Sequence, residues 1–311
     1  MRRIWFIGLF LSSSVLAQGL VVGASTAIVE SLVQGVSGED VQIVTVVPPG
    51  SDPHTFEPRP SVLRELNQAQ AFFAIGLGYE YWLDDLASNL PDSTQIVELG
   101  ENLENLICLG EEPSERNHDH GACNPHVWLD PNLAIKMIDQ IAVTLSDLEP
   151  NRAEVYRQNS RNFQEQIKAI DQETRACLAQ IPAVNKKFVA QHDAFAYLSR
   201  AYGLDQVGTL ATVSAQERGT QSFAKLVEKS RQERVKVVFA EPQLPKRTAE
   251  TLAQEIGAQV YSLYSDALDQ EVDSYLELLS HNSATICQAF SQLRTSAMIR
   301  CATSLAIQGG W

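Results

Sequence analysis

The segment from Asn151 to Ala179 most constrains how this chain folds, because it contains neither glycine nor proline. Apolar or semi-apolar residues recur along it in steps of 7, 4, 3, 4 and 3, at Tyr156, Phe163, Ile167, Ile170, Thr174 and Cys177. This spacing predicts one face of an amphipathic helix, about 40 Å long at 1.5 Å per residue. Pro150 and Pro182 mark its two ends. A long surface helix would give the same pattern, but the composition changes at this segment and favours a rigid connector between two domains.

On both sides of this helix, short β-branched runs alternate with segments of helical period. The predicted strands are residues 20–23, 41–47, 71–75, 95–98, 187–190, 235–240 and 259–263, and the predicted helices are residues 27–36, 62–69, 81–88, 194–202, 223–232, 246–256 and 274–293. This alternation is typical of parallel sheets covered on both faces. We expect an α/β fold with two lobes, each a mostly parallel sheet flanked by helices. The predicted lobes are residues 18–148 and 182–311, and the predicted connecting helix is residues 149–181.

Residues 1–17 have the pattern of a cleavable secretory signal peptide. Arg2 and Arg3 precede an apolar run, and Val15 and Ala17 supply the small residues before a cleavage site. The run is too short to span a bilayer, no cysteine follows it to carry a lipid anchor, and no later stretch reaches 18 apolar residues. We expect a soluble protein in a bacterial periplasm or outside the cell.

The charge of the chain excludes several classes of partner. The formal net charge is −14, with 24 Lys+Arg against 38 Asp+Glu. Phosphate backbones and anionic lipid surfaces repel such a chain, so we expect no nucleic-acid or membrane-surface role. Excess carboxylate suits cationic ligands, but it serves solubility equally well.

The chain has five cysteines, at positions 108, 123, 177, 287 and 301, and none of them forms a C-x-x-C pair. Disulfides are expected in an oxidising compartment, and the odd number leaves at least one thiol unpaired in a monomer. Cys108 and Cys123 bracket a polar loop, and Cys287 and Cys301 could tie down the C-terminal tail. Both pairings stay open, because sequence does not fix disulfide connectivity.

Histidines follow predicted strands in both halves of the chain. His54 and His192 come shortly after strands, Asp266 follows the last strand, and His126 lies in an Asn-Pro-His block. In open α/β sheets, ligand-binding groups collect beyond the carboxyl ends of the strands. Taken singly, each histidine could be an ordinary surface or hydrogen-bonding residue, and Asp266 a helix N-cap. As a set, three imidazoles and one carboxylate suit a closed tetrahedral Zn²⁺ site between the lobes.

Sequence blocks around these residues resemble those of a known family. The blocks are VPPGSDPH at residues 47–54, IGLG at 75–78, YWL at 81–83, NPHVWLDP at 124–131, HDAFAY at 192–197 and FAEPQ at 239–243. In this order, with the long central helix, they resemble the zinc- and manganese-binding solute-binding proteins of bacterial ABC importers, over essentially all of the mature chain. The resemblance implies two α/β lobes joined by a rigid helix, with metal held between them and delivered to an ABC permease. It maps the metal ligands onto His54, His126, His192 and Asp266.

The resemblance also bears on which metal is bound. Family members that resemble manganese carriers have a Glu at the position of His192, which adds an oxygen ligand for a harder ion. Three nitrogen ligands favour Zn²⁺, and Mn²⁺ is the alternative within the family.

The zinc members of the family share a His-rich loop before the second ligand, and here that loop is reduced to His118, Asp119 and His120 with nearby acids. It could capture zinc weakly, or it could be a mobile acidic loop. A periplasmic zinc chaperone is a further candidate partner. We interpret His281 as structural or exposed.

The main alternative from another class is a secreted zinc hydrolase with Glu241 as its general base. Against it, four protein ligands would close the coordination sphere, and H-E-x-x-H is absent from the sequence. G-x-S-x-G and P-loop motifs are also absent. An adhesion or sensor module on the same scaffold is a third possibility, since fold does not settle function. The sequence therefore favours a monomeric, non-enzymatic zinc carrier.

Overall fold

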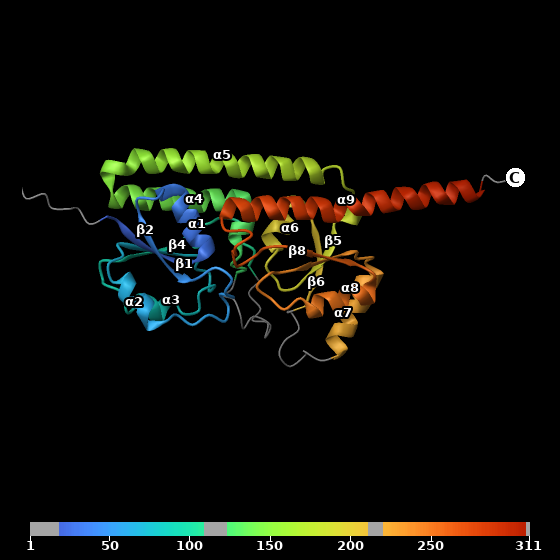
Figure 1. Cartoon of the computed structure of the whole chain (residues 1–311), viewed down its shortest axis with the longest axis horizontal. Coiled ribbons are helices and arrows are strands. Elements are labelled where there is room, and N and C mark those ends of the chain that lie inside the picture. The colour runs from blue at the N-terminus through green and yellow to red at the C-terminus, as the bar shows by residue number, and fades with distance from the viewer. Residues whose placement is uncertain (1–18, 109–122, 211–219, 309–311) are drawn as a thin grey trace, which may run out of the picture.

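The computed structural model describes residues 19–108, 123–210 and 220–308, with side chains described as far as Gln292. These residues form two α/β lobes that lie side by side and are bridged by long helices, as the sequence predicts (Figure 1). The predicted signal peptide, residues 1–17, lies outside the described residues, as do His118, Asp119 and His120.

The N-terminal lobe contains a four-stranded parallel sheet in the order β2-β1-β3-β4. Its strands are β1 Val21–Thr26, β2 Gln42–Val47, β3 Ala71–Ala74 and β4 Gln95–Glu98, and its helices are α1 Ala27–Ser37, α2 Pro60–Leu66 and α3 Leu83–Ala87. Every residue of β1 is buried, as expected for a central strand covered on both faces. The Thr26 hydroxyl caps α1 by accepting a hydrogen bond from the backbone N–H of Val29.

The C-terminal lobe repeats this plan with a parallel sheet in the order β6-β5-β7-β8. Its strands are β5 Lys187–Ala190, β6 Asp205–Thr209, β7 Val237–Ala240 and β8 Gln259–Ser262, and its helices are α6 Ala196–Tyr202, α7 Thr220–Gln232 and α8 Arg247–Ile256. Sequence reasoning missed β6. This edge strand reads Asp-Gln-Val-Gly-Thr and is only partly buried, so it lacks the apolar run that reveals the inner strands.

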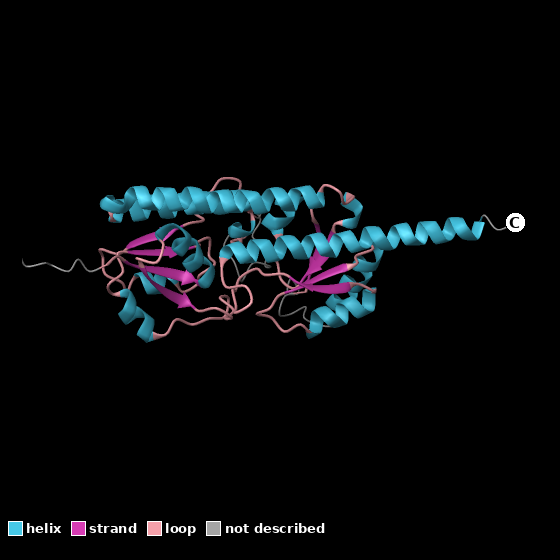
Figure 2. Cartoon of the chain, turned by 45° about the horizontal axis from the view of Figure 1, so that its top comes forward, coloured by secondary structure: helices cyan, strands magenta, loops and turns pink. Residues whose placement is uncertain are grey.

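Helix α5 Ala153–Leu178 bridges the lobes, and two further long helices, α4 Pro131–Leu148 and α9 Tyr275–Gln308, pack against it. Helix α5 is the predicted connector, and it packs along α4 and α9 across both lobes (Figures 1 and 2). The sequence analysis missed α4 and placed the end of α9 at residue 293, whereas α9 continues to Gln308. None of the described helices is both long and apolar enough to cross a membrane.

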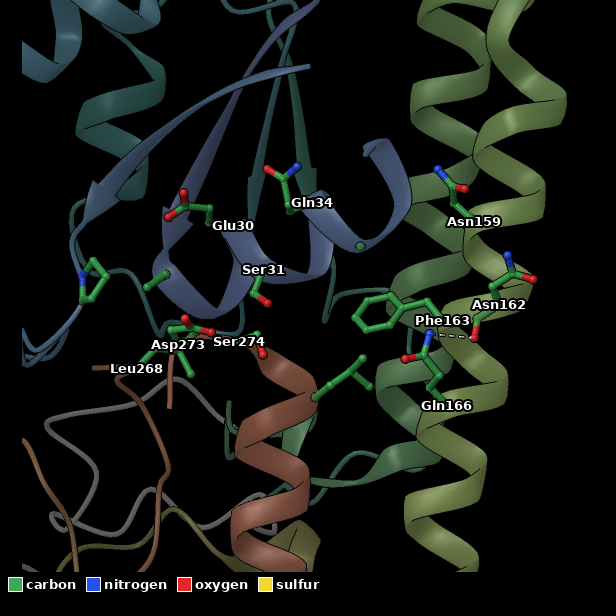
Figure 3. Close-up of a pocket in the computed structure, with 14 residues that line it drawn as sticks. Glu30, Ser31, Gln34, Asn159, Asn162, Phe163, Gln166, Leu268, Asp273 and Ser274 are labelled. Carbon is green, nitrogen blue, oxygen red and sulfur yellow. Dashed lines mark hydrogen bonds between the residues drawn. The ribbon is translucent and has the colours of Figure 1, made fainter. Parts of the chain in front are cut away.

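The first turn of α9 meets α1 and α5 at the junction of the lobes. The Ser31 hydroxyl of α1 accepts a 2.8 Å hydrogen bond from the backbone N–H of Tyr275. Phe163 of α5 points toward α1 (Figure 3), and a Cβ atom at Gly35 would lie 2.3 Å from its ring, so this close approach requires glycine. A cavity of about 560 Å³ opens beside Phe163, and none of the four predicted metal ligands lines it.

Two disulfides lie within the described part of the chain. Cys108 pairs with Cys123, which is one of the two pairings that the sequence left open. The other suggested pairing, Cys287 with Cys301, is wrong, because Cys287 pairs with Cys177 and joins α9 to α5. Cys287 and Cys301 lie on one continuous helix. At 1.5 Å per residue they are about 21 Å apart, whereas the Cα atoms of a disulfide are within about 7 Å.

Candidate metal centre

Four residues predicted from the sequence come together between the lobes. His54 lies in the loop after β2, and His126 immediately precedes a short 3₁₀ helix, Val127–Leu129. His192 follows β5 by two residues, and Asp266 follows β8 by four. Each offers one ligand atom, and these atoms all lie within 4.8 Å of one another.

The spacing of these atoms suits a tetrahedral ion. Zinc bonds of about 2.0–2.1 Å to nitrogen or oxygen place neighbouring ligand atoms roughly 3.3 Å apart. From the carboxylate oxygens of Asp266, Nε2 of His54 lies at 3.4 Å, Nε2 of His126 at 3.1 Å and Nε2 of His192 at 3.0 Å. The Nε2 atoms of His126 and His192 are 3.3 Å apart. The four groups are therefore spaced to hold one small cation with little movement.

Burial differs among the four residues in a way that indicates how a metal enters. The side chains of His126 and Asp266 are 0% and 1% exposed, whereas those of His192 and His54 are 12% and 21% exposed. His54 and His192 therefore form the accessible side of the centre. A metal ion can meet these imidazoles before it contacts the buried pair.

Hydrogen bonds to Nδ1 turn two of the imidazoles toward the centre. Nδ1 of His192 lies 2.8 Å from a carboxylate oxygen of Glu241, and Nδ1 of His126 lies 2.9 Å from the amide oxygen of Asn124. Both oxygens accept hydrogen bonds, so both Nδ1 atoms carry hydrogen and leave Nε2 for a metal. Such partners fix the ring orientation and raise the basicity of metal-binding histidines. The loop that carries His54 is shaped by Asp52, whose carboxylate accepts the backbone N–H of His54 at 3.0 Å.

Glu241, which the sequence suggested as a base for a hydrolase, is fully buried directly behind His192. Besides His192, its carboxylate accepts hydrogen bonds from the Ser265 hydroxyl and from the side-chain amide of Gln243. Its backbone N–H donates to the side-chain oxygen of Gln191 at 2.8 Å. Glu241 follows β7, the neighbour of β5, which places it beside His192. Glu241 therefore supports His192 from behind. It is not one of the four residues whose ligand atoms cluster.

Tyr79 and Glu80 belong to the surroundings of the centre, and sequence reasoning did not identify their roles. The Tyr79 hydroxyl donates to Asp266 at 3.4 Å. The buried Glu80 carboxylate accepts the backbone N–H groups of Ile75 and Gly76 at 2.9 and 3.0 Å, and burial raises its pKa. These bonds hold the turn that includes Leu77, which has a φ of 58° between two glycines. The IGLG block at residues 75–78 was the signal in the sequence that could have indicated this turn, which directly precedes Tyr79.

The three histidines differ in their protonation. Complete burial outweighs the attraction of Asp266 and lowers the pKa of His126 to about 3. For His192, burial acts in the same direction, but the charges of Asp266 and Glu241 outweigh it and raise its pKa well above the usual value. The pKa of His54 is also raised, because Asp266 more than offsets its burial. Burial opposes ionisation of Asp266, but the facing imidazoles of His126 and His192 hold its pKa well below its usual value.

Metal binding is therefore expected to release at least one proton at pH 7. A metal must displace the proton on Nε2 of His192, and affinity should rise with pH until the raised pKa of His192 is passed, by about tenfold per pH unit for each proton displaced. As the pH falls through the pKa of His54, a second proton competes with the metal, and zinc affinity then depends more steeply on pH. His126 is already neutral above about pH 3, so it releases no proton when a metal binds there. Calorimetric zinc titrations in buffers of different ionisation enthalpy measure the number of protons released.

The matched variant for this measurement is Glu241→Gln. It removes one of the two carboxylates that raise the pKa of His192, so the protonated fraction at pH 7 and the number of protons released should both fall. A wild-type protein that binds zinc at pH 7 without releasing a proton would contradict the protonation states described above.

Contacts between the lobes close the structure around the centre. The indole N–H of Trp128 donates to the backbone oxygen of Ser265 at 2.8 Å, and the Tyr275 hydroxyl donates to the backbone oxygen of Trp128 at 2.6 Å. The backbone N–H of Gly50 donates to the backbone oxygen of Leu268 at 2.7 Å. By contrast, His281 lies outside the centre. Its Nε2 atom is 3.2 Å from the backbone oxygen of Ser262, in keeping with the structural role expected for it.

Comparisons with known proteins identify the family and the fold of the chain. The family model described as zinc-uptake complex component A, periplasmic, matches residues 22–289. A protein from Treponema pallidum (strain Nichols) is 31% identical, over 85% of this chain and 84% of its own length. The manganese-binding lipoprotein MntA of Halalkalibacterium halodurans is 26% identical, over 88% of this chain and 90% of its own. The crystal structure of a ZnuA deletion mutant with zinc bound superposes with a TM-score of 0.75, at 27% identity, covering 88% of this chain and 98% of that one.

Proposed function

The chain belongs to the family of periplasmic zinc-uptake component A proteins, and we propose that it captures Zn²⁺ between its two lobes and delivers the ion to an ABC-type permease. Family members are metal-binding solute-binding proteins of ABC importers and not enzymes. The specific metal, the four ligands His54, His126, His192 and Asp266, and transfer to a permease are the parts that we propose.

The ligand set is the observation that carries the choice of zinc. Three imidazole nitrogens and the carboxylate of Asp266 offer ligand atoms within 4.8 Å of one another, and the nitrogens of His126 and His192 lie 3.1 and 3.0 Å from that carboxylate, close to tetrahedral spacing. Zinc is commonly held at four-coordinate sites by nitrogen ligands, whereas manganese and magnesium favour sites richer in oxygen with more ligands. The buried pair, His126 and Asp266, leaves little room for extra water ligands.

Manganese is the second candidate, because relatives of this chain include a manganese-binding lipoprotein. Two features of the centre count against it. The Glu that would supply a further oxygen ligand is replaced by His192, and two nearby carboxylates are engaged elsewhere: Glu241 behind that histidine and Asp52 on the backbone N–H of His54.

Release of the ion is expected to involve local rearrangement near His54 rather than wide separation of the lobes. Helix α5 packs against α1 and α4 on the N-terminal side and against α9 on the C-terminal side, and the Cys177–Cys287 disulfide joins it to α9. A frame of this kind resists a large hinge motion. The loop that carries His54 is the most exposed part of the centre, so it can move while the frame stays fixed.

Direct competition between zinc and manganese tests this proposal. Protein purified without chelator is expected to contain one zinc ion per chain, measured by elemental analysis. Metal-free protein offered equimolar Zn²⁺ and Mn²⁺ should retain zinc. Retention of manganese under these conditions would assign the chain to manganese carriage, and binding of neither ion would overturn the proposed centre.

A further inference from the structure

The Cys108–Cys123 disulfide closes on a residue that contacts the proposed metal centre. Besides the disulfide, the two cysteines form an isolated antiparallel bridge. The next residue along, Asn124, donates its backbone N–H to the backbone oxygen of Ile107 at 2.8 Å. The disulfide and this hydrogen bond together fix the backbone of Asn124 relative to residues 107–108.

Helix α6 holds the same pair of segments from the C-terminal lobe. The hydroxyl of the buried Tyr197 accepts the backbone N–H of Ile107 at 3.0 Å and donates to the backbone oxygen of Asn124 at 2.9 Å. The side-chain amide N–H of Asn124 donates to the backbone oxygen of Asp193 at 2.8 Å, next to His192. Asn124 is therefore anchored through both its backbone and its side chain.

The amide oxygen of Asn124 is directed at His126. It accepts the backbone N–H of His126 at 3.1 Å and lies 2.9 Å from Nδ1 of the same residue. An amide oxygen can only accept, and the amide nitrogen is already engaged with Asp193, so hydrogen must reside on Nδ1 of His126. The neutral ring then presents an unprotonated Nε2 to the centre, 3.1 Å from Asp266.

We propose that Asn124 is a positioning residue for metal capture and that the Cys108–Cys123 disulfide, by fixing Asn124, sets the affinity of the centre. This inference rests on the proposed function, because it concerns the same ion. When the disulfide is formed, Asn124 selects one tautomer and one orientation of His126. When it is absent, the backbone of Asn124 is held only by the hydrogen bond that it donates to Ile107 and the one that it accepts from Tyr197, and the imidazole gains freedom that metal binding must remove.

Formation of this bond is a two-electron oxidation. The thiols of Cys108 and Cys123 lose two protons and two electrons as their sulfur atoms join, and a thiol–disulfide oxidoreductase in its disulfide form accepts both and becomes a dithiol. Cys108 is an exposed residue, which favours access of such an enzyme. The inference links the oxidation state of the compartment to retention of the metal.

Serine variants test this inference better than a reducing agent, because dithiols and free cysteine thiolates bind zinc themselves. All proteins would carry Cys301→Ser, which removes the fifth thiol. Zinc dissociation constants would be measured by competition with a chromophoric chelator. The Cys108→Ser/Cys123→Ser variant is expected to bind zinc about 10–100-fold more weakly. The Cys177→Ser/Cys287→Ser variant is the matched control, and it should melt at lower temperature but keep its zinc affinity within about threefold.

Asn124 is tested in the same background. Asn124→Ala is expected to weaken zinc binding by about 10–100-fold, and adding the Cys108→Ser/Cys123→Ser pair should weaken it little further, because both changes act through one residue. Asn124→Asp keeps an oxygen that accepts from His126 but loses the donor to the backbone oxygen of Asp193, so it should restore part of the affinity. Nitrogen-15 NMR of the metal-free imidazoles should show the Nδ1–H tautomer of His126 in wild type and Asn124→Asp, and a tautomer mixture in Asn124→Ala.

The outcomes separate this inference from the proposed function. Unchanged zinc affinity in folded Cys108→Ser/Cys123→Ser protein would overturn the inference and leave the function intact, as would equal weakening in the Cys177→Ser/Cys287→Ser control. A wild-type protein with no zinc affinity would overturn the proposed function. In that case the NMR tautomer of metal-free His126 still decides whether Asn124 positions the ring.

Discussion

Replacing both His54 and His192 with alanine is expected to abolish stoichiometric zinc binding. Structural zinc sites with four protein ligands contribute about 10–16 kcal/mol, or roughly 3 kcal/mol per ligand. Each lost imidazole should therefore cost on the order of 100-fold in affinity, and two should cost about 10⁴-fold. Both side chains are partly exposed at the accessible side of the centre, so truncation should leave the core of each lobe intact. Elemental analysis of the purified variant and a chelator competition assay measure the loss.

The matched control is His281→Ala, which removes an imidazole from the same chain outside the centre. His281 hydrogen-bonds to the backbone of Ser262 and packs its ring edge-on against Tyr264 at 4.9 Å. This variant is expected to lose some thermal stability and to bind one zinc ion with wild-type affinity. If the His54→Ala/His192→Ala variant still retained one tightly bound ion, the assignment of these two residues as ligands would be wrong.

The residues of the centre could be predicted from the sequence because their position is a property of the topology. Parallel strands point their carboxyl ends toward the same edge, so His54, His192 and Asp266 fall on the facing edges of the two sheets whatever the details of packing. His126 does not follow a strand. Its Asn-Pro-His block places it at the start of a 3₁₀ helix, so strand position does not account for its place in the predicted set, onto which the family resemblance also mapped a ligand.

The residues around the ligands could not be predicted, because their roles depend on register and on turns. Glu241 supports His192 only because β7 pairs with β5 at Phe239 and Ala190, and a sequence does not reveal that register. The orientation of Tyr79 depends on the left-handed backbone of the turn at residues 76–78. Asn124 belongs to the Asn-Pro-His motif, but the sequence does not indicate which groups its amide contacts. In the structure its nitrogen donates to Asp193 and its oxygen faces His126.

The errors in the predicted fold have similar causes. Helix α4 begins at Pro131, whose preceding Asp130 accepts the backbone N–H of Asn132 as an N-cap, and both residues had been interpreted as parts of a motif. The odd number of cysteines indicated at least one unpaired thiol in a monomer but did not indicate which cysteine it is. The packing of α5 against α9 decides that Cys287 pairs with Cys177, and packing of helices distant in sequence is not readable from local periodicity.

Replacing His192 with glutamate is expected to weaken the preference for zinc over manganese substantially only when Glu241 is changed as well. The substitution converts three nitrogens and one oxygen into two of each, which suits a harder ion. In the wild type, however, Nδ1 of His192 donates to Glu241 at 2.8 Å. A carboxylate at position 192 would face the buried carboxylate of Glu241 without a proton between them, and like charges this close oppose ionisation of both.

The paired variant His192→Glu/Glu241→Gln removes this conflict, because the glutamine amide N–H can donate to the new carboxylate. We expect the ratio of zinc to manganese affinity to fall by about 10-fold or more relative to wild type. Manganese affinity should also be higher in the paired variant than in His192→Glu alone. In the single variant one of the two facing carboxyl groups keeps a proton, and the metal must displace that proton to bind. Glu241→Gln alone is the control, and it should keep the preference for zinc because all three imidazoles remain. Equal manganese affinity in the single and paired variants would show that Glu241 does not control which ligand position 192 accepts.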